Sequence, residues 1–71
     1  MSQREKDRQE VLAAVYSSIE QGMDSGSVGV YIDLARGYGQ KHEIEVQSWW
    51  MAGRRIFADT EDARQWAQTL P

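Results

Sequence analysis

The sequence predicts an α+β domain in which a helix, a three-stranded antiparallel sheet and a second helix follow one another along the chain. Two of the supporting observations are that residues 2–21 and 59–70 each combine a helix-capping residue with apolar side chains at helical spacing. The third is that residues 28–51 contain two runs in which apolar and polar residues alternate. With 71 residues, the whole chain (1–71) is predicted to form a single small domain.

The first helix is predicted to span residues 2–21. Ser2 and Glu5 stand three positions apart, the spacing at which a serine caps a helix and a glutamate reaches back to it. Gly22 follows, and glycine readily takes the left-handed conformation that ends many helices. The apolar stripe expected to face the core consists of Leu12, Val15, Ile19 and Met23.

The middle of the chain is predicted to form the sheet. Residues 22–29 are rich in glycine and serine and predict a loop. Residues 28–35 then alternate between apolar and other side chains, which is typical of a strand with one buried face. Residues 36–41 contain two glycines and predict a reversal, after which residues 43–51 alternate again as the second strand of a hairpin. Residues 55–58 are predicted to add a short third strand.

The last helix is predicted to begin at Asp59 or Thr60, because either side chain can accept a hydrogen bond from a free N–H group of the first turn. Glu61 and Asp62 would then lie at the positive end of the helix dipole, which favours carboxylates. The apolar face of this helix consists of Ala63, Trp66, Ala67 and Leu70.

A second interpretation makes residues 34–54 helical. They resemble the helix-turn-helix of excisionases and of regulators of mercury-resistance type, in which one helix ends at a glycine and the next enters the major groove. The resemblance rests on Leu34-Ala35, Tyr38-Gly39, Val46-Gln47-Ser48-Trp49 and Ala52-Gly53-Arg54. It implies a mostly helical fold and a small DNA-binding transcriptional regulator or excisionase-like protein. Because Val, Ile, Tyr and Trp favour strands, the structure of residues 42–51 discriminates between the two interpretations.

The composition argues against catalysis, cofactors and metals. The chain has no cysteine and a single histidine, His42, so neither a disulfide nor a structural zinc site is expected. No nucleophile, phosphate-binding loop or carboxylate pair is accompanied by a positioned partner, so we expect no enzymatic activity and no cofactor. The charged N-terminus lacks the apolar segment of a signal peptide, and no apolar run is long enough to span a bilayer. These features predict a cytoplasmic protein that does not enter the membrane.

The predicted hairpin carries a candidate protein-binding surface. Neighbouring residues of a strand point to opposite faces, so Trp50 is expected in the core and Trp49 on the partly exposed face. Exposed tryptophan and tyrosine are enriched at the hot spots of protein interfaces. The surface is expected to consist of Tyr31, Glu45, Gln47 and Trp49. It also predicts a homodimer, because two-fold symmetry would bring the aromatic pair of each chain together.

A second candidate surface is basic. It consists of Arg36, Lys41, Arg54 and Arg55, which could bind the phosphates of nucleic acid. The net charge of −3, from 8 basic and 11 acidic residues, makes nucleic acid the less favoured partner. The main functional prediction is therefore a small non-enzymatic regulatory or inhibitory protein, of phage or mobile-element type, that acts by binding another protein.

Overall fold

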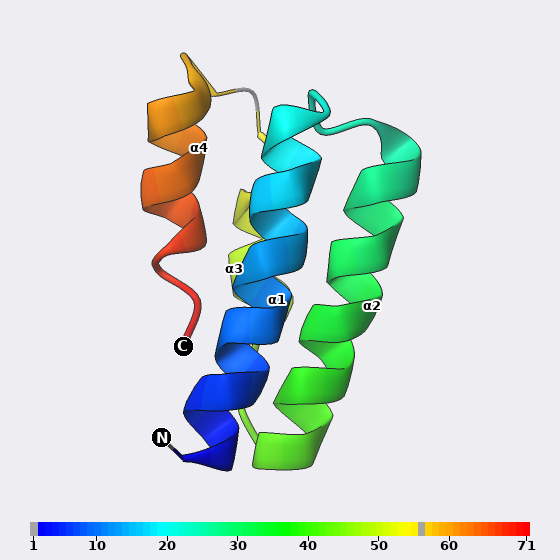
Figure 1. Cartoon of the computed structure of the whole chain (residues 1–71), viewed down its shortest axis with the longest axis vertical. Coiled ribbons are helices and arrows are strands. Elements are labelled where there is room, and N and C mark those ends of the chain that lie inside the picture. Colours follow the sequence, from blue (N-terminus) through cyan, green and yellow to red (C-terminus); the bar gives the residue numbers. More distant parts are fainter. Residues whose placement is uncertain (1, 56) are drawn as a thin grey trace.

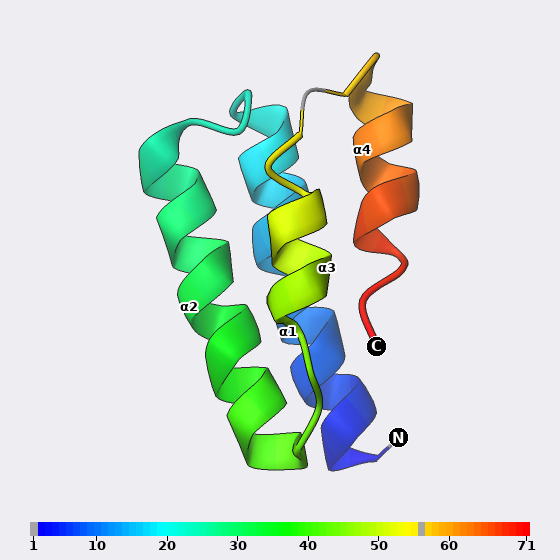
Figure 2. The same ribbon diagram turned by 180° about the vertical axis from the view of Figure 1, so that it is seen from behind.

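The computed structural model describes residues 2–55 and 57–71, which fold into a bundle of helices. The helices are α1 (Gln3–Glu20), α2 (Ser25–His42), α3 (Gln47–Ala52) and α4 (Thr60–Ala67). Consecutive helices run in opposite directions, with α1 and α2 side by side and the short α3 behind them (Figure 1 and Figure 2). Helix α4 packs along the other side of α1, and both termini lie toward the same end of the bundle (Figure 1).

The predicted α+β fold with a three-stranded antiparallel sheet is wrong, because the residues that the structure describes contain no strand. The expected strand at residues 28–35 and the expected reversal at 36–41 both lie within α2. The expected second strand at 43–51 is an irregular segment followed by α3. Of the expected third strand at 55–58, Ile56 lies outside the described residues and the others have irregular backbone.

The alternative interpretation agrees with the structure in its helix content but differs from it in geometry. Instead of ending at Gly39, α2 continues to His42. Helices α2 and α3 then lie nearly antiparallel (Figure 2), whereas the two helices of a helix-turn-helix meet at about 90–120°. The segment at residues 34–54 is therefore a helix, a short loop and a helix in a different arrangement.

Apolar residues occur at every second position of residues 28–34 because they lie on two different sides of α2. Val28 and Ile32 are four residues apart and half buried, while Val30 and Leu34, also four apart, are exposed. Residues two apart thus fall on different sides of the helix, although their order in the sequence is the same as in a strand. The buried face of α2 is formed by Tyr31, Ala35, Tyr38 and Gly39.

Hydrogen bonds at both ends define α2. The Asp24 side chain accepts a hydrogen bond from the Ser27 backbone N–H at 3.0 Å, so the helix begins inside the expected loop at residues 22–29. At the other end, Glu43 has the left-handed φ of 55°, and the Ile44 N–H donates to the Gly39 carbonyl at 2.8 Å. This left-handed turn is the usual way to end a helix, although glycine normally occupies it. The chain therefore reverses immediately after α2.

The two adjacent tryptophans are both buried because they lie on a helix. Trp49 is 6% exposed and Trp50 is 8% exposed. Consecutive helical residues are about 100° apart around the axis, so both rings can lie on the inner half of α3. On a strand they would have faced opposite sides. The predicted core position of Trp50 is confirmed, and the predicted exposure of Trp49 is wrong.

The first and last helices confirm their predicted caps and apolar faces. The Ser2 side chain accepts a hydrogen bond from the Glu5 N–H at 3.2 Å, and the Asp59 side chain accepts one from the Asp62 N–H at 2.8 Å. Gly22, just after α1, has a φ of 80°. The predicted apolar residues that are buried are Leu12, Val15, Ile19, Ala63, Trp66, Ala67 and Leu70, while Met23 is half buried against them.

An aromatic cluster joins α2, α3 and α4. The rings of Trp49 and Trp66 stack with centroids 4.7 Å apart. The Trp66 indole N–H donates to the Trp49 carbonyl at 3.0 Å, and the Trp49 indole N–H donates to the Trp66 carbonyl at 3.3 Å. Tyr31 of α2 meets both rings edge-on, each at 6.0 Å between centroids. The cluster thus holds the six-residue helix α3 in place through aromatic packing and reciprocal hydrogen bonds.

Asp7 joins the beginning of α1 to the end of α2. Its carboxylate lies 2.8 Å from Nε2 of His42 and 3.1 Å from Nζ of Lys41, and it accepts a hydrogen bond from the Gln3 side chain at 2.8 Å. These three interactions, with that of His42 the largest, lower the pKa of Asp7 to about 2. His42, the sole histidine, therefore has a structural partner on α1.

We expect the Asp7 interactions to make stability depend on pH in acid. Because the folded state lowers the pKa of Asp7 to about 2, the ionised carboxylate stabilises the fold above its unfolded pKa of about 4. That contribution is lost as the pH falls from about 4 to about 2. The Asp7→Asn variant should melt below wild type at neutral pH, and the gap should close over this range. Melting curves with Asp33→Asn as the control test this, and a constant gap would contradict it.

Candidate functional site

Two residues of the predicted contact surface lie in the core. Tyr31 is 0% exposed and Trp49 is 6% exposed, so the predicted exposure of this aromatic pair is wrong. The helices turn both rings toward Trp66, where strands would have turned them outward. In this fold the pair cannot form the two-fold contact from which the homodimer was predicted. The other two predicted residues, Glu45 and Gln47, are exposed.

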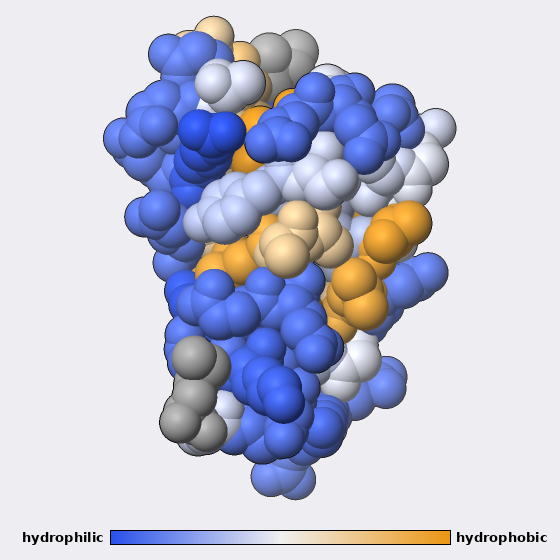
Figure 3. Space-filling view, viewed as in Figure 1, coloured by the Kyte–Doolittle hydropathy of each residue, from blue (hydrophilic) through white to orange (hydrophobic). Residues whose placement is uncertain are grey.

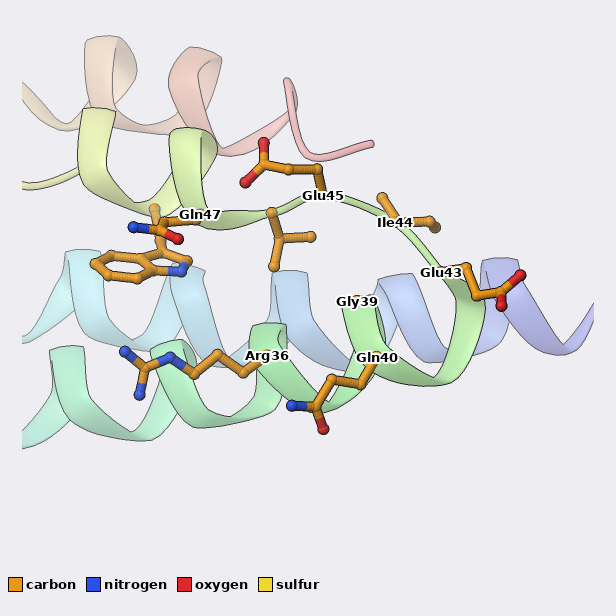
Figure 4. A pocket seen from close by; sticks show the side chains of 9 residues that line it. Arg36, Gly39, Gln40, Glu43, Ile44, Glu45 and Gln47 are labelled. Carbon is orange, nitrogen blue, oxygen red and sulfur yellow. The ribbon is translucent and has the colours of Figure 1, made fainter.

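The remaining candidates border a groove between α2 and the segment that leads into α3. The groove has a volume of about 420 Å³. It is lined by Arg36, Gly39, Gln40, Glu43, Ile44, Glu45, Val46, Gln47 and Trp50. Figure 4 shows Arg36 and Gln40 projecting from α2, and Gln47 on the neighbouring α3. The structure thus brings Arg36, from the predicted basic surface, together with Glu45 and Gln47 from the predicted protein-binding surface.

Two arginines lie over the ring of Trp50. Arg36 lines the α2–α3 groove, whereas Arg54 lines a neighbouring hollow between α2 and the turn after α3. The guanidinium carbon of Arg36 lies 5.1 Å from the centroid of the Trp50 ring, and that of Arg54 lies 6.0 Å from it. Both distances are within the range of a cation–π interaction, which orients each guanidinium while leaving its N–H edge free. Within the described part of the chain, neither arginine forms an ion pair. Their positive charge is therefore available to a ligand.

The other two predicted basic residues lie elsewhere and have partners. Lys41 is 3.1 Å from Asp7, on the α1 side of α2. Arg55 lies 4.0 Å from Asp62 and packs over the Phe57 ring at 5.2 Å. The predicted basic surface thus divides into a pair of arginines at Trp50 and two cations that interact within the chain.

Gly39 allows the loop after α2 to lie directly on the helix. A Cβ atom at this position would lie 2.7 Å from the Ile44 carbonyl oxygen and 3.0 Å from a methyl group of Val46. The first distance is too short for real atoms, so any side chain here would push the loop away. The loop residues are themselves groove-lining, so the width of the groove depends on this glycine.

The acidic side chains lie at the other end of the groove. The Glu45 carboxylate accepts a hydrogen bond from the Ser48 N–H at 3.1 Å, and this bond lowers the pKa of Glu45. Glu45 thus takes the capping role at α3, since Val46 at the cap position has no side-chain hydrogen bond of this kind. Figure 4 shows Glu43 and Glu45 turned away from Arg36. The groove is therefore basic near Trp50 and acidic along the loop.

Six groove residues were not among the predicted site residues, and one of them, Trp50, was predicted as a core residue. They are Gly39, Gln40, Glu43, Ile44, Val46 and Trp50. Arg36 and Gln40 are four residues apart, so they share one side of a helix. That spacing would have revealed the groove wall if α2 had been recognised as helical. Nothing in the sequence indicates that the loop at residues 43–46 folds back over α2.

A comparison with known protein families, curated proteins and solved structures found no match. Among the residues that the structure describes, no group of three or more His, Cys, Asp or Glu side chains could hold a metal ion. In the same residues, no helix has both the length and the apolar character needed to cross a membrane.

Proposed function

We propose that this chain is a small non-enzymatic regulatory protein that binds another protein by holding a carboxylate-bearing segment of it in the α2–α3 groove. The observation that carries the proposal is that Arg36, in the groove, and Arg54, beside it, lie over Trp50 and form no ion pair within the described residues. A guanidinium offers two parallel N–H donors to a carboxylate, and these bonds are stronger than neutral ones. Because the ring already orients both arginines, little conformational freedom remains to be lost on binding.

The rest of the groove favours an extended peptide over a uniform polyanion. Gln40 and Gln47 present side-chain amides that can donate to and accept from a peptide backbone. Val46 and Trp50 give the groove apolar surface, as is usual in binding sites for peptides and small molecules. At the loop end, Glu43 and Glu45 would repel a nucleic acid backbone that continued along the groove, whereas a peptide can carry a different charge there.

The proposal predicts that reversing both arginine charges abolishes capture of a partner. The Arg36→Glu/Arg54→Glu variant should retain a specific partner from a lysate at least tenfold less than wild type, a loss of about 1.4 kcal/mol or more. The matched control is Arg4→Glu/Lys6→Glu, which changes the net charge by the same amount on exposed positions of α1. The retained proteins would be quantified by mass spectrometry.

The groove proposal is tested by comparing the partners retained by the Arg36→Glu/Arg54→Glu variant and by the Arg4→Glu/Lys6→Glu control. Loss of the partner in the groove variant alone supports the proposal, whereas equal loss in both variants indicates an effect of overall charge. Retention of the same partners by the groove variant would contradict the proposal. Circular dichroism of each variant checks that the helices are intact.

DNA binding by residues 34–54 remains the second candidate function, favoured by the helix at residues 47–52 and by the same two arginines. Fewer side chains support it, because Trp49 and Trp50 are buried and the exposed face of α3 carries Gln47, Ser48 and Met51. Fluorescence anisotropy with a duplex DNA probe distinguishes the two functions. Binding that weakens steeply with salt and needs the arginines would favour DNA.

A further inference from the structure

The outer face of the α1–α2 pair carries apolar side chains that the bundle leaves uncovered. Val30 is 58% exposed and Leu34 is 44% exposed, and they lie one turn apart on α2. Helices α3 and α4 pack elsewhere on the bundle, so this face has no further layer (Figure 1). In the same orientation, Figure 3 shows apolar side chains gathered over α2. We call Val30, Leu34 and the groove beside them the α1–α2 face.

Two hollows lie in the groove of the α1–α2 face. One, of about 230 Å³, borders Leu34, with Val11 on α1 and Gly37 on α2 also lining it. The other, of about 400 Å³, borders Val30 and Ala14 and lies nearer the loop between the helices. The exposed apolar side chains of Val30 and Leu34 thus have a hollow on either side, the second one lined mostly by serine and other polar residues. A groove of this shape can receive the ridge of another helix.

The charges around this face are mostly negative. Glu10 and Asp33 border the first hollow and form no ion pair within the described residues. Asp24 borders the second hollow. The cation at this face, Lys41, is already held 3.1 Å from Asp7. Asp24 is already bonded to the Ser27 N–H as the cap of α2. A partner that covers the apolar centre would therefore meet the carboxylates of Glu10 and Asp33 at its edge.

We propose that the α1–α2 face binds an amphipathic helix of another protein whose apolar side contacts Val30 and Leu34 and whose flanking residues are basic. The stretch of α2 from Gly26 to Gly37 is about 17 Å long, which a partner helix of about three turns would cover. A second copy of this chain fits less well, because a two-fold contact would place Glu10 and Asp33 of both copies in one interface. This surface is separate from the α2–α3 groove, so the chain has two contact faces that share α2.

The test uses two synthetic helical peptides of about 18 residues, long enough to be helical in solution. Both carry the same pattern of leucine and alanine, and their polar positions are lysine in one peptide and glutamate in the other. Fluorescence anisotropy measures the binding of each labelled peptide to the full chain. We expect the lysine peptide to bind and the glutamate peptide to bind at least tenfold more weakly.

Variants locate the binding site. The Val30→Ser/Leu34→Ser variant should bind the lysine peptide at least tenfold more weakly than wild type. The matched control is Met51→Ser, which removes a side chain of similar exposure, 51%, from α3 and should leave binding unchanged. The Arg36→Glu/Arg54→Glu variant should also still bind the lysine peptide, so failure of the groove proposal leaves this proposal intact.

Four outcomes would overturn the proposal. They are weak binding of both peptides, equal binding of both peptides, unchanged binding by the Val30→Ser/Leu34→Ser variant, and a wild-type dimer that this variant converts to a monomer. The last, measured by sedimentation, would identify a second copy of the chain as the occupant of the face. Circular dichroism and melting of each variant confirm that the bundle is folded before binding is compared.

Discussion

Replacing Trp66 with alanine is expected to remove most of the stability of the bundle. The Trp66 side chain is 6% exposed, stacks on Trp49 at 4.7 Å and meets Tyr31 at 6.0 Å. Truncating a buried tryptophan costs about 3–5 kcal/mol, because it removes apolar burial and leaves a cavity. A chain of this length has a total stability of about 4–10 kcal/mol. Thermal and urea denaturation should therefore show the variant largely unfolded or melting at least about 12 °C lower.

Trp66→Phe is the informative companion of this variant. Phenylalanine keeps an aromatic ring beside Trp49 but removes the indole N–H that donates to the Trp49 carbonyl at 3.0 Å. The Trp49 carbonyl still accepts a hydrogen bond from the Gly53 N–H at 3.2 Å, so the loss should be smaller, about 0.5–1.5 kcal/mol, the typical net contribution of one hydrogen bond. If Trp66→Ala melted within a few degrees of wild type, the aromatic cluster would not be the centre of the core.

Replacing Gly53 with alanine is expected to be nearly as damaging, although it adds a single methyl group. A Cβ atom at Gly53 would lie 2.0 Å from the Cζ2 atom of Trp66 and 2.4 Å from its Cη2 atom. The Gly53 backbone has φ −70° and ψ −7°, a conformation that alanine adopts freely, so the damage comes from the collision alone. Moving the Trp66 ring would break its stack with Trp49. We expect a loss of about 3 kcal/mol, at the upper end for overpacking.

Gly37→Ala is the matched control, and its effect should have the opposite sign. Gly37 lies in α2, and a Cβ atom there meets nothing within 4 Å. The same substitution should therefore stabilise the chain by about 0.5–1 kcal/mol, because alanine loses less conformational freedom than glycine in a helix. Urea denaturation of both variants at one temperature measures the difference.

A double-mutant cycle identifies the origin of the Gly53 effect. If the added methyl group collides with the Trp66 ring, Gly53→Ala should cost little in a Trp66→Phe background, where the six-membered ring of the indole is absent. If Gly53→Ala lost the same free energy of unfolding in the Trp66→Phe background as in wild type, the collision would be contradicted. The effect would then come from the backbone conformation at Gly53.

The candidate site was partly predictable from the sequence. Arg36, Glu45, Gln47 and Arg54 were selected by residue type, and the structure places them on or beside one groove. Their grouping was not predictable, because it depends on the loop at residues 43–46 folding over α2 above Gly39. Glu45 and Gln47 were predicted on a protein-binding surface, and Arg36 and Arg54 on a separate basic surface. In the folded chain all four lie in one region of the molecule.

The aromatic residues show why the predicted surface failed. The expectation for Tyr31 and Trp49 followed from the strand rule that alternate residues share a face. That rule requires knowing the secondary structure first. On helices the same residues face α4, and they pack against Trp66 from a different element.

Local signals in the sequence were sufficient to specify the first and last helices, α1 and α4. The caps at Ser2 and Asp59, the glycine at position 22 and the spacing of the apolar residues are local signals that survive in the fold. Each signal acts within one or two helical turns, so no distant contact is needed to interpret it. The burial of Trp66 follows from the same local periodicity.

The secondary structure of the middle of the chain depends on long-range packing. The apolar positions at 28, 30, 32 and 34 fit either one face of a strand or two sides of a helix, and the glycines of α2 weaken a helix locally. Packing of Tyr31, Ala35 and Tyr38 in the core stabilises the helix over the strand. A strand would also need a partner for its backbone hydrogen bonds, whereas a helix satisfies them within itself. The local pattern was ambiguous, and long-range packing removed the ambiguity.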